Sequence, residues 1–181
     1  MANAHGPVRA KMTATVTIDA PAAKVWEVIK NYDDMSWHPA IKSVKGDGTN
    51  NKGAVRTLTL SNGTITEELK AYDAAKMSYK YKITDMSSTG TIKHAGQDEA
   101  IPVLPVGNYA GDISVEDKGG KAEVEWVATY YRAYVNNNPP AELNEEAADK
   151  AVTDVLKSGL EALAKKVAPG ATPSVHIDIK R

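Results

Sequence analysis

The sequence predicts an α+β fold, in which a curved antiparallel sheet of about six to seven strands surrounds one long C-terminal helix. Short alternating segments separated by turn residues follow one another through the middle of the 181-residue chain, which is typical of an antiparallel meander. Residues 141–167 place apolar side chains at steps of three and four, with Gly159 as the one helix breaker, which indicates a helix. With 42% apolar residues, the chain can bury one substantial core.

The N-terminal part is expected to form one strand and two short helices. Residues 8–18 alternate and are rich in β-branched side chains, so a first strand is predicted. Pro21 is a favourable start for a helix because its missing N–H has no partner in a first turn. A second helical turn at residues 33–37 must end at His38, because the following proline disfavours helical geometry in the residue before it.

The remaining strands are expected to form consecutive hairpins. They are predicted at residues 41–45, 54–60, 64–72, 77–84, 109–116 and 122–131, and residues 174–180 are predicted to add an edge strand or remain disordered. The helix over residues 141–167 would be about 40 Å long at 1.5 Å per residue, enough to cross the concave face of the sheet. Small residues along its apolar stripe favour either unfilled space beneath it or a close approach to the sheet.

Composition excludes several classes of function. A formal net charge of −1 argues against a nucleic-acid binder, and no apolar run approaches the roughly 20 residues that span a bilayer, so we expect no membrane insertion. The chain has no Cys, which excludes disulfides, thiolate catalysis and Cys-based zinc sites. Its four histidines form no metal-binding pair, and phosphate-loop and dinucleotide motifs are missing, so neither metal nor cofactor is expected.

The first residues suggest a compartment. Ala2-Asn3-Ala4 has the small-x-small form of a signal-peptidase site, followed by His5. We therefore expect a periplasmic protein whose signal peptide has been removed, with an ordinary polar tail as the alternative.

Strand alternation predicts which side chains face the interior. If Lys80 and Lys82 face outward, Tyr79 and Tyr81 face inward, and the same reasoning applies to the other strands. The residues predicted to line a cavity and bind a ligand are Arg56, Glu67, Tyr79, Tyr81, Tyr109, Trp126, Tyr130 and Arg132; Ile65, Leu69 and Ala71 are predicted to share the face of Glu67.

The charged members of this set must pair, because an unpaired buried charge costs several kcal/mol. We expect a polar cluster of Arg56 and Glu67, with Arg132 as a further candidate, ringed by tyrosines. Its functional interpretation is recognition of a small ligand with an anionic or hydroxylated end. The alternative is an ion pair that satisfies only itself.

Trp37 and His38 are predicted to form the rim of this cavity. His38 could serve as a base with Asp33 or Asp34 nearby, but a histidine before proline at a helix end is more often a capping or rim residue. No catalytic residue is therefore predicted.

The order of strand, helix, short helix, strands and long helix resembles the Bet v 1-like, START-related SRPBCC superfamily with its helix-grip fold, over about residues 14–167. More specifically, the chain resembles the MxaD-like periplasmic accessory proteins of bacterial methanol oxidation, and secondarily polyketide cyclase/dehydrase-type members. The resemblance depends on Ala20-Pro21 with Val25-Trp26, residues 37–43 and 72–79, Val124-Glu125-Trp126 with Tyr131-Arg132, Asn138-Pro139-Pro140 with Leu143-Asn144, and Ser158-Gly159-Leu160.

The resemblance implies a non-catalytic accessory protein that supports methanol dehydrogenase or its electron transfer to a cytochrome c. A carrier of small hydrophobic molecules or lipids and a polyketide cyclase- or dehydratase-like enzyme are the alternatives. The expected organisation is a tail and the start of strand one at residues 1–12, a helix-grip domain at 13–167 and an extension at 168–181. An inserted loop or hairpin at 87–101 departs from the family pattern, so a partner-binding surface does not transfer directly.

Overall fold

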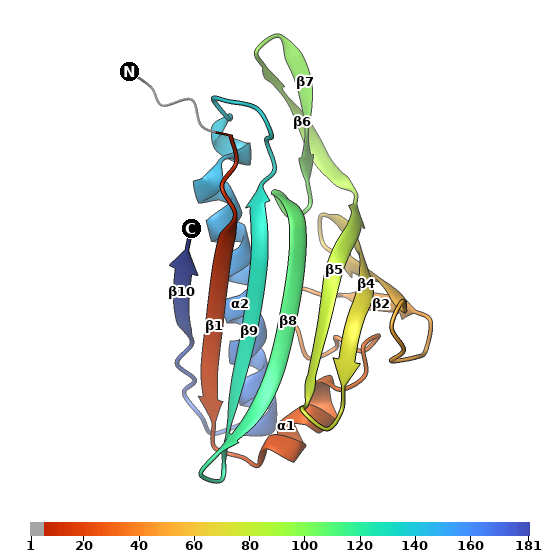
Figure 1. Cartoon of the computed structure of the whole chain (residues 1–181), viewed down its shortest axis with the longest axis vertical. Helices are drawn as coiled ribbons and strands as arrows, with labels where there is room; N and C mark the ends of the chain where they lie inside the picture. The colour runs from red at the N-terminus through yellow and green to blue at the C-terminus, as the bar shows by residue number, and fades with distance from the viewer. Residues whose placement is uncertain (1–5) are drawn as a thin grey trace.

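The computed structural model describes residues 6–181, which form one eight-stranded antiparallel sheet, a separate two-stranded hairpin and two α-helices (Figure 1). The Ala2-Asn3-Ala4 motif lies outside the described residues. The elements are β1 (Ala10–Ile18), α1 (Ala22–Ile29), β2 (Ser43–Gly46), β3 (Val55–Leu60), β4 (Gly63–Asp73), β5 (Ser78–Met86), β6 (Ser88–His94), β7 (Gln97–Pro102), β8 (Val106–Lys118), β9 (Lys121–Arg132), the 3-10 turn η1 (Ala141–Leu143), α2 (Glu145–Val167) and β10 (His176–Lys180).

The strands of the large sheet lie in the order β10-β1-β9-β8-β5-β4-β3-β2. Helix α2 crosses one face of this sheet and contacts β1 and β9, while α1 lies at the lower end in the view (Figure 1). The apolar stripe of α2 and the inward side chains of the strands form the core. This is the predicted helix-grip architecture.

Helix α2 has clear start and stop signals. The Asn144 side chain accepts a hydrogen bond from the Ala147 backbone N–H at 2.8 Å, which satisfies one of the donors left free at a helix N-terminus. Acidic residues occupy the first turn and basic residues the last, so both ends complement the helix dipole. The helix therefore begins after the predicted position 141, where a short 3-10 turn stands instead.

Two fold predictions were wrong in detail. The second short helix at residues 33–37 does not form, and residues 31–40 make a series of turns. The sheet has eight strands rather than six to seven, because β10 pairs with the outer edge of β1, from Lys11 opposite Lys180 to Thr15 opposite His176.

Strand alternation is interrupted by a bulge in β4. The register between β4 and β5 shifts between Leu69 and Ala71, so one residue is left unpaired and the following side chains change face. Ala71, predicted to face inward, is exposed, and Tyr72 instead stacks on Tyr79 with ring centroids 6.1 Å apart.

Strands β6 and β7 form a hairpin that projects beyond the end of the large sheet (Figure 1). Its inner face touches the segment after β9: the His94 Nε2 is 2.7 Å from the Asn138 carbonyl oxygen, and the His94 ring meets Tyr134 edge-on at 5.2 Å. Within residues 6–181, no helix has the length and apolar character needed to cross a membrane.

Candidate functional site

A small interior cavity lies between the sheet and α2. Its volume is about 30 Å³, and its lining is mainly apolar. Sites for small organic ligands usually have volumes of about 300–1,000 Å³, whereas one water needs roughly 10–15 Å³. The polar side chains at its wall include Glu67, Tyr81 and His38.

Arg56 and Glu67 form a buried ion pair beside this cavity. They face each other across β3 and β4, and Glu67 Oε1 accepts from Arg56 Nε at 2.9 Å and lies 2.8 Å from Nη2. Arg56 also donates to the Tyr32 carbonyl at 2.6 Å, and its guanidinium lies 4.0 Å from the centre of the Tyr32 ring. The ion pair, hydrogen bonds and cation–π contact of Arg56 are therefore made with Glu67 and Tyr32.

The environment moves both pKa values of the pair. Burial is the largest single influence and lowers the pKa of Arg56, but Glu67 together with Tyr79, Tyr32 and Tyr81 outweighs it and leaves this pKa above its ordinary value. Burial raises the pKa of Glu67, and the Arg56 guanidinium opposes this rise. Each charge is thus tolerated in the interior because of its partner.

Aromatic side chains continue this cluster along the inner face of the sheet. Trp126 donates its indole N–H to the Tyr81 hydroxyl at 3.0 Å, and the Tyr81 ring lies 6.4 Å from that of Tyr109. Burial raises the pKa of Tyr81 well above its ordinary value, and burial likewise raises those of Tyr79 and Tyr109. These phenols stay neutral at physiological pH, so in the interior they act only as hydrogen-bond donors and acceptors.

His38 connects the turn after α1 to the long helix. Its Nε2 lies 2.8 Å from the Val155 carbonyl oxygen of α2, and its Nδ1 accepts from the Ala40 backbone N–H at 3.1 Å. The ring is therefore the neutral tautomer with its proton on Nε2, and burial lowers its pKa. With both ring nitrogens occupied, His38 is poorly placed to act as a base.

The residues expected at a rim are buried. Only 4% of Trp37 and 2% of His38 are exposed. His38 lines the cavity, and the Trp37 ring packs against Trp126 with centroids 5.6 Å apart. They close the interior rather than border an opening.

The structure separates Arg132 from the other predicted site residues, and it places Tyr130 at the end of their row. Arg132 donates to Glu145 at 2.6 Å and to the carbonyl oxygens of Tyr134 and Asn136. The Tyr130 hydroxyl donates to Asp149 at 2.7 Å, while its ring stacks on that of Tyr109 with centroids 6.5 Å apart. Arg132 thus holds the connection between β9 and α2, whereas the other predicted site residues lie along the interior: Arg56, Glu67, Tyr79, Tyr81, Tyr109, Trp126 and Tyr130.

Tyr32 is the important residue that sequence reasoning missed. It follows α1 and stands three positions after Ile29, so it continues the apolar stripe of the helix, which was an available signal. The Tyr32 hydroxyl and the Trp37 Nε1 are buried and have no hydrogen-bond partner among residues 6–181. Such groups are rare in folded proteins, because each loses its bonds to water.

A metal site has no support from the described part of the chain, since residues 6–181 contain no group of three or more His, Cys, Asp or Glu side chains placed to hold an ion.

The family model for "Polyketide cyclase / dehydrase and lipid transport" matches residues 9–168. No curated protein matches the chain at a significant level.

Solved structures are similar over almost the whole chain. The protein XoxI from Bacillus cereus is 24% identical with a TM-score of 0.66, covering 87% of this chain and 94% of that one. Norcoclaurine synthase from Thalictrum flavum, solved with dopamine and hydroxybenzaldehyde, is 15% identical with a TM-score of 0.61, covering 92% and 91%. Ara h 8.0201 is 17% identical with a TM-score of 0.61, covering 90% and 100%. At these identities, the likeness shows the fold.

Proposed function

Because the chain belongs to the polyketide cyclase / dehydrase and lipid transport family, within the Bet v 1-like SRPBCC superfamily, we propose that it is a non-catalytic binding protein of the periplasm. Its specific role is to support a methanol dehydrogenase or electron transfer from that enzyme to a cytochrome c. The resemblance to MxaD-like proteins provides this partner.

The observation that supports the proposal is the nearly filled interior. The cavity of about 30 Å³ leaves little room for a substrate. The polar groups around it bond to one another, as Arg56 does to Glu67 and Trp126 to Tyr81. A protein with such an interior acts best through contacts at its surface. A cyclase or dehydratase acting through His38 has less support, because both ring nitrogens are engaged.

The direct test adds the purified chain to a methanol dehydrogenase and its cytochrome c, while reduction of the cytochrome is followed by absorbance. We expect the rate to rise with the concentration of the chain and then reach a plateau. The heat-unfolded chain is the control and should leave the rate unchanged. An unchanged rate with the folded chain over the whole concentration range would refute the role.

A second candidate is a carrier of a small hydrophobic molecule. It is favoured by the Tyr32 hydroxyl and the Trp37 Nε1, which are buried without a hydrogen-bond partner among residues 6–181. If the interior side chains rearranged to admit a ligand or a water, it would form hydrogen bonds with these two groups. Native mass spectrometry of the chain purified from its own host tests this. A mass excess that disappears on denaturation supports a carrier, and its absence counts against one. Arg56→Met then tests the cluster: unchanged ligand binding and unchanged partner activation would exclude a functional role for it.

A further inference from the structure

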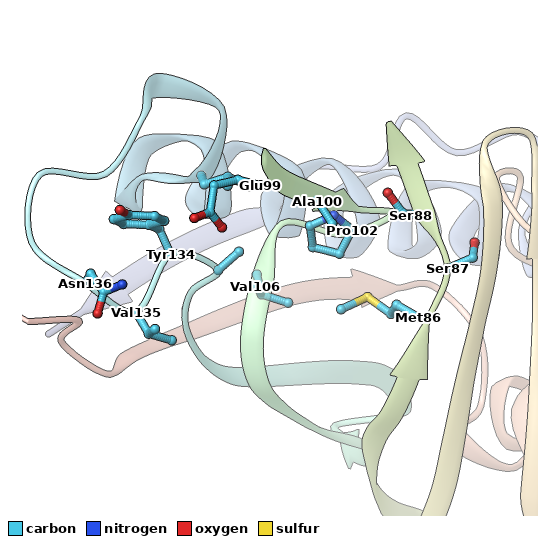
Figure 2. A pocket seen from close by; sticks show the side chains of 12 residues that line it. Met86, Ser87, Ser88, Glu99, Ala100, Pro102, Val106, Tyr134, Val135 and Asn136 are labelled. Carbon is cyan, nitrogen blue, oxygen red and sulfur yellow. The ribbon is translucent and has the colours of Figure 1, made fainter. Parts of the chain in front are cut away.

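A second hollow lies outside the space between the large sheet and α2. It is formed between the β6–β7 hairpin and the segment that follows β9 (Figure 2). Its volume is about 340 Å³, which falls within the range of small-ligand sites. We call it the outer pocket. The segment from Leu104 to Val106 separates the two hollows, since Leu104 lines the interior cavity and Val106 lines the outer pocket.

Much of the outer pocket is apolar. Met86, Pro102, Val106 and Leu143 contribute to its walls. Val135 also lines it and is 71% exposed, an unusually high value for a large aliphatic side chain in this chain. Val106 and Leu143 are already buried, so it is the covering of Met86, Pro102 and Val135 that would remove apolar surface from water and favour binding of an apolar body.

One charge in the outer pocket is not neutralised. Glu99, from β7, is half-buried, and its carboxylate makes no hydrogen bond or ion pair with any residue of the described range 6–181. Figure 2 shows this carboxylate directed into the pocket, whose lining also includes Tyr134. A cation in the pocket would therefore be attracted by the carboxylate.

Neighbouring cations are already engaged elsewhere. Arg132, which holds the adjacent segment, is 2.6 Å from Glu145. Lys93 of the hairpin pairs at 3.0 Å with Asp98, which precedes Glu99 and therefore points to the opposite face of the strand. Glu99 is thus the charge that the pocket offers to a ligand.

The walls of the pocket are held in place before any ligand arrives. His94 ties the hairpin to the segment after β9 through the Asn138 carbonyl and the Tyr134 ring. Arg132 fixes the same segment from the other side by donating to the carbonyl oxygens of Tyr134 and Asn136. A site organised in advance loses less entropy on binding.

We propose that the outer pocket binds a small primary amine with an apolar body, with its ammonium group on the Glu99 carboxylate and its apolar part on Val106 and Met86. This site is separate from the interior cavity and does not depend on the function proposed above. Its chemistry follows from Glu99, the one charged side chain that the described residues contribute to the lining, beside apolar side chains such as Met86 and Val106.

The test uses 2-phenylethylamine as the probe and 2-phenylethanol as the uncharged analogue of similar size. Each is titrated into the ¹⁵N-labelled chain and followed by amide chemical shifts. We expect the amine to shift the amides of residues 86–88, 99–101 and 133–136, and to bind at least about fivefold more tightly than the alcohol.

Glu99→Gln should weaken amine binding by about fivefold and leave alcohol binding unchanged. Asp98→Asn is the matched control, because it removes the adjacent carboxylate on the opposite face, and it should bind the amine as the unmodified chain does. Equal binding of amine and alcohol by the unmodified chain would overturn the proposal. So would equal effects of the two substitutions, or shifts confined to the lining of the interior cavity.

Discussion

Arg56 is buried to 99% of its surface, with only 1% exposed, and yet it keeps its charge. It does so because Glu67 and the Tyr32 carbonyl accept its hydrogen bonds, and the Tyr32 ring covers one face of its guanidinium. An ion pair of this kind contributes little net stability, but removing one member leaves an uncompensated charge in the interior.

Replacing Arg56 by Met should therefore lower the free energy of unfolding by about 3–5 kcal/mol at pH 7. The loss should shrink as the pH falls. Burial raises the pKa of Glu67, and without Arg56 nothing opposes that rise, so Glu67 takes up a proton more readily in the folded state than in the unfolded one. Stability that depends on this proton is present at low pH and is lost as the pH rises through the folded-state pKa.

Urea unfolding of Arg56→Met at pH 5 and pH 7 measures this difference. The double variant Arg56→Met/Glu67→Leu is the control, since it removes both charges and should recover most of the loss at pH 7. A double variant no more stable than Arg56→Met would show that shape rather than charge governs the site.

His38 makes a second residue-scale prediction, in which the unmodified chain loses stability as the pH falls. Burial lowers its pKa, so the unfolded chain, with an ordinary histidine pKa of about 6.5, binds the proton first as the pH falls. The stability that neutral His38 provides is thus present above that pH and is lost below it. His38→Gln removes this titrating group. The unmodified chain should unfold at a higher urea concentration than His38→Gln at pH 7.5, and this difference in midpoint should shrink at pH 5. A constant difference would contradict this explanation.

At the scale of an element, α2 lies close to the sheet because one of its positions has no side chain. A Cβ at Gly159 would lie 2.6 Å from His38 Cδ2 and 2.8 Å from Trp126 Cζ3. Of the two sequence interpretations of the small residues in this helix, close approach therefore describes Gly159.

Gly159→Ala should destabilise the fold by about 1–3 kcal/mol, because the added methyl group overpacks the contact with two rigid rings. In an exposed helix, the same change would stabilise by about 1 kcal/mol. Thermal unfolding measures the sign, and Ser158→Ala at the adjacent, partly exposed position serves as the matched control with a change near zero. A stabilised Gly159→Ala would mean that the rings move aside at little cost.

At the scale of the whole molecule, β10 covers the outer edge of β1. Its side chains are mostly exposed, so it buries little apolar surface, but it takes up the backbone hydrogen-bonding groups along that edge. Exposed strand edges pair readily with other chains. The C-terminal extension therefore replaces the nine-residue edge of β1 by the five-residue edge of β10, and it does this more than it enlarges the core.

Removing residues 174–181 should leave a folded chain that self-associates more strongly than the full chain does. Light scattering after size-exclusion chromatography over a range of concentrations measures the apparent mass. Arg181→Ala is the control, because it breaks the ion pair with Asp149 at 2.7 Å and keeps the strand, and its apparent mass should match that of the full chain. An unchanged mass after truncation would argue against edge protection by β10.

The sequence by itself determined the fold class and most of the interior face of the sheet. Both depend on local periodicity: alternation placed Arg56, Tyr81 and Trp126 on the buried side, and steps of three and four predicted α2. The family resemblance agreed with these patterns. The second helix predicted at residues 33–37 was wrong, because so short a segment carries too weak a signal to predict a helix, and the structure has turns there.

Only the tertiary structure decided which of the buried residues meet. Arg132 pairs with Glu145 rather than with Glu67. Because of the bulge in β4, Tyr72 rather than Ala71 faces the interior. His38 found its partner 117 positions away, at the Val155 carbonyl. Register, bulges and sheet twist set such pairings, and these depend on the whole packed molecule rather than on the pattern of any single strand.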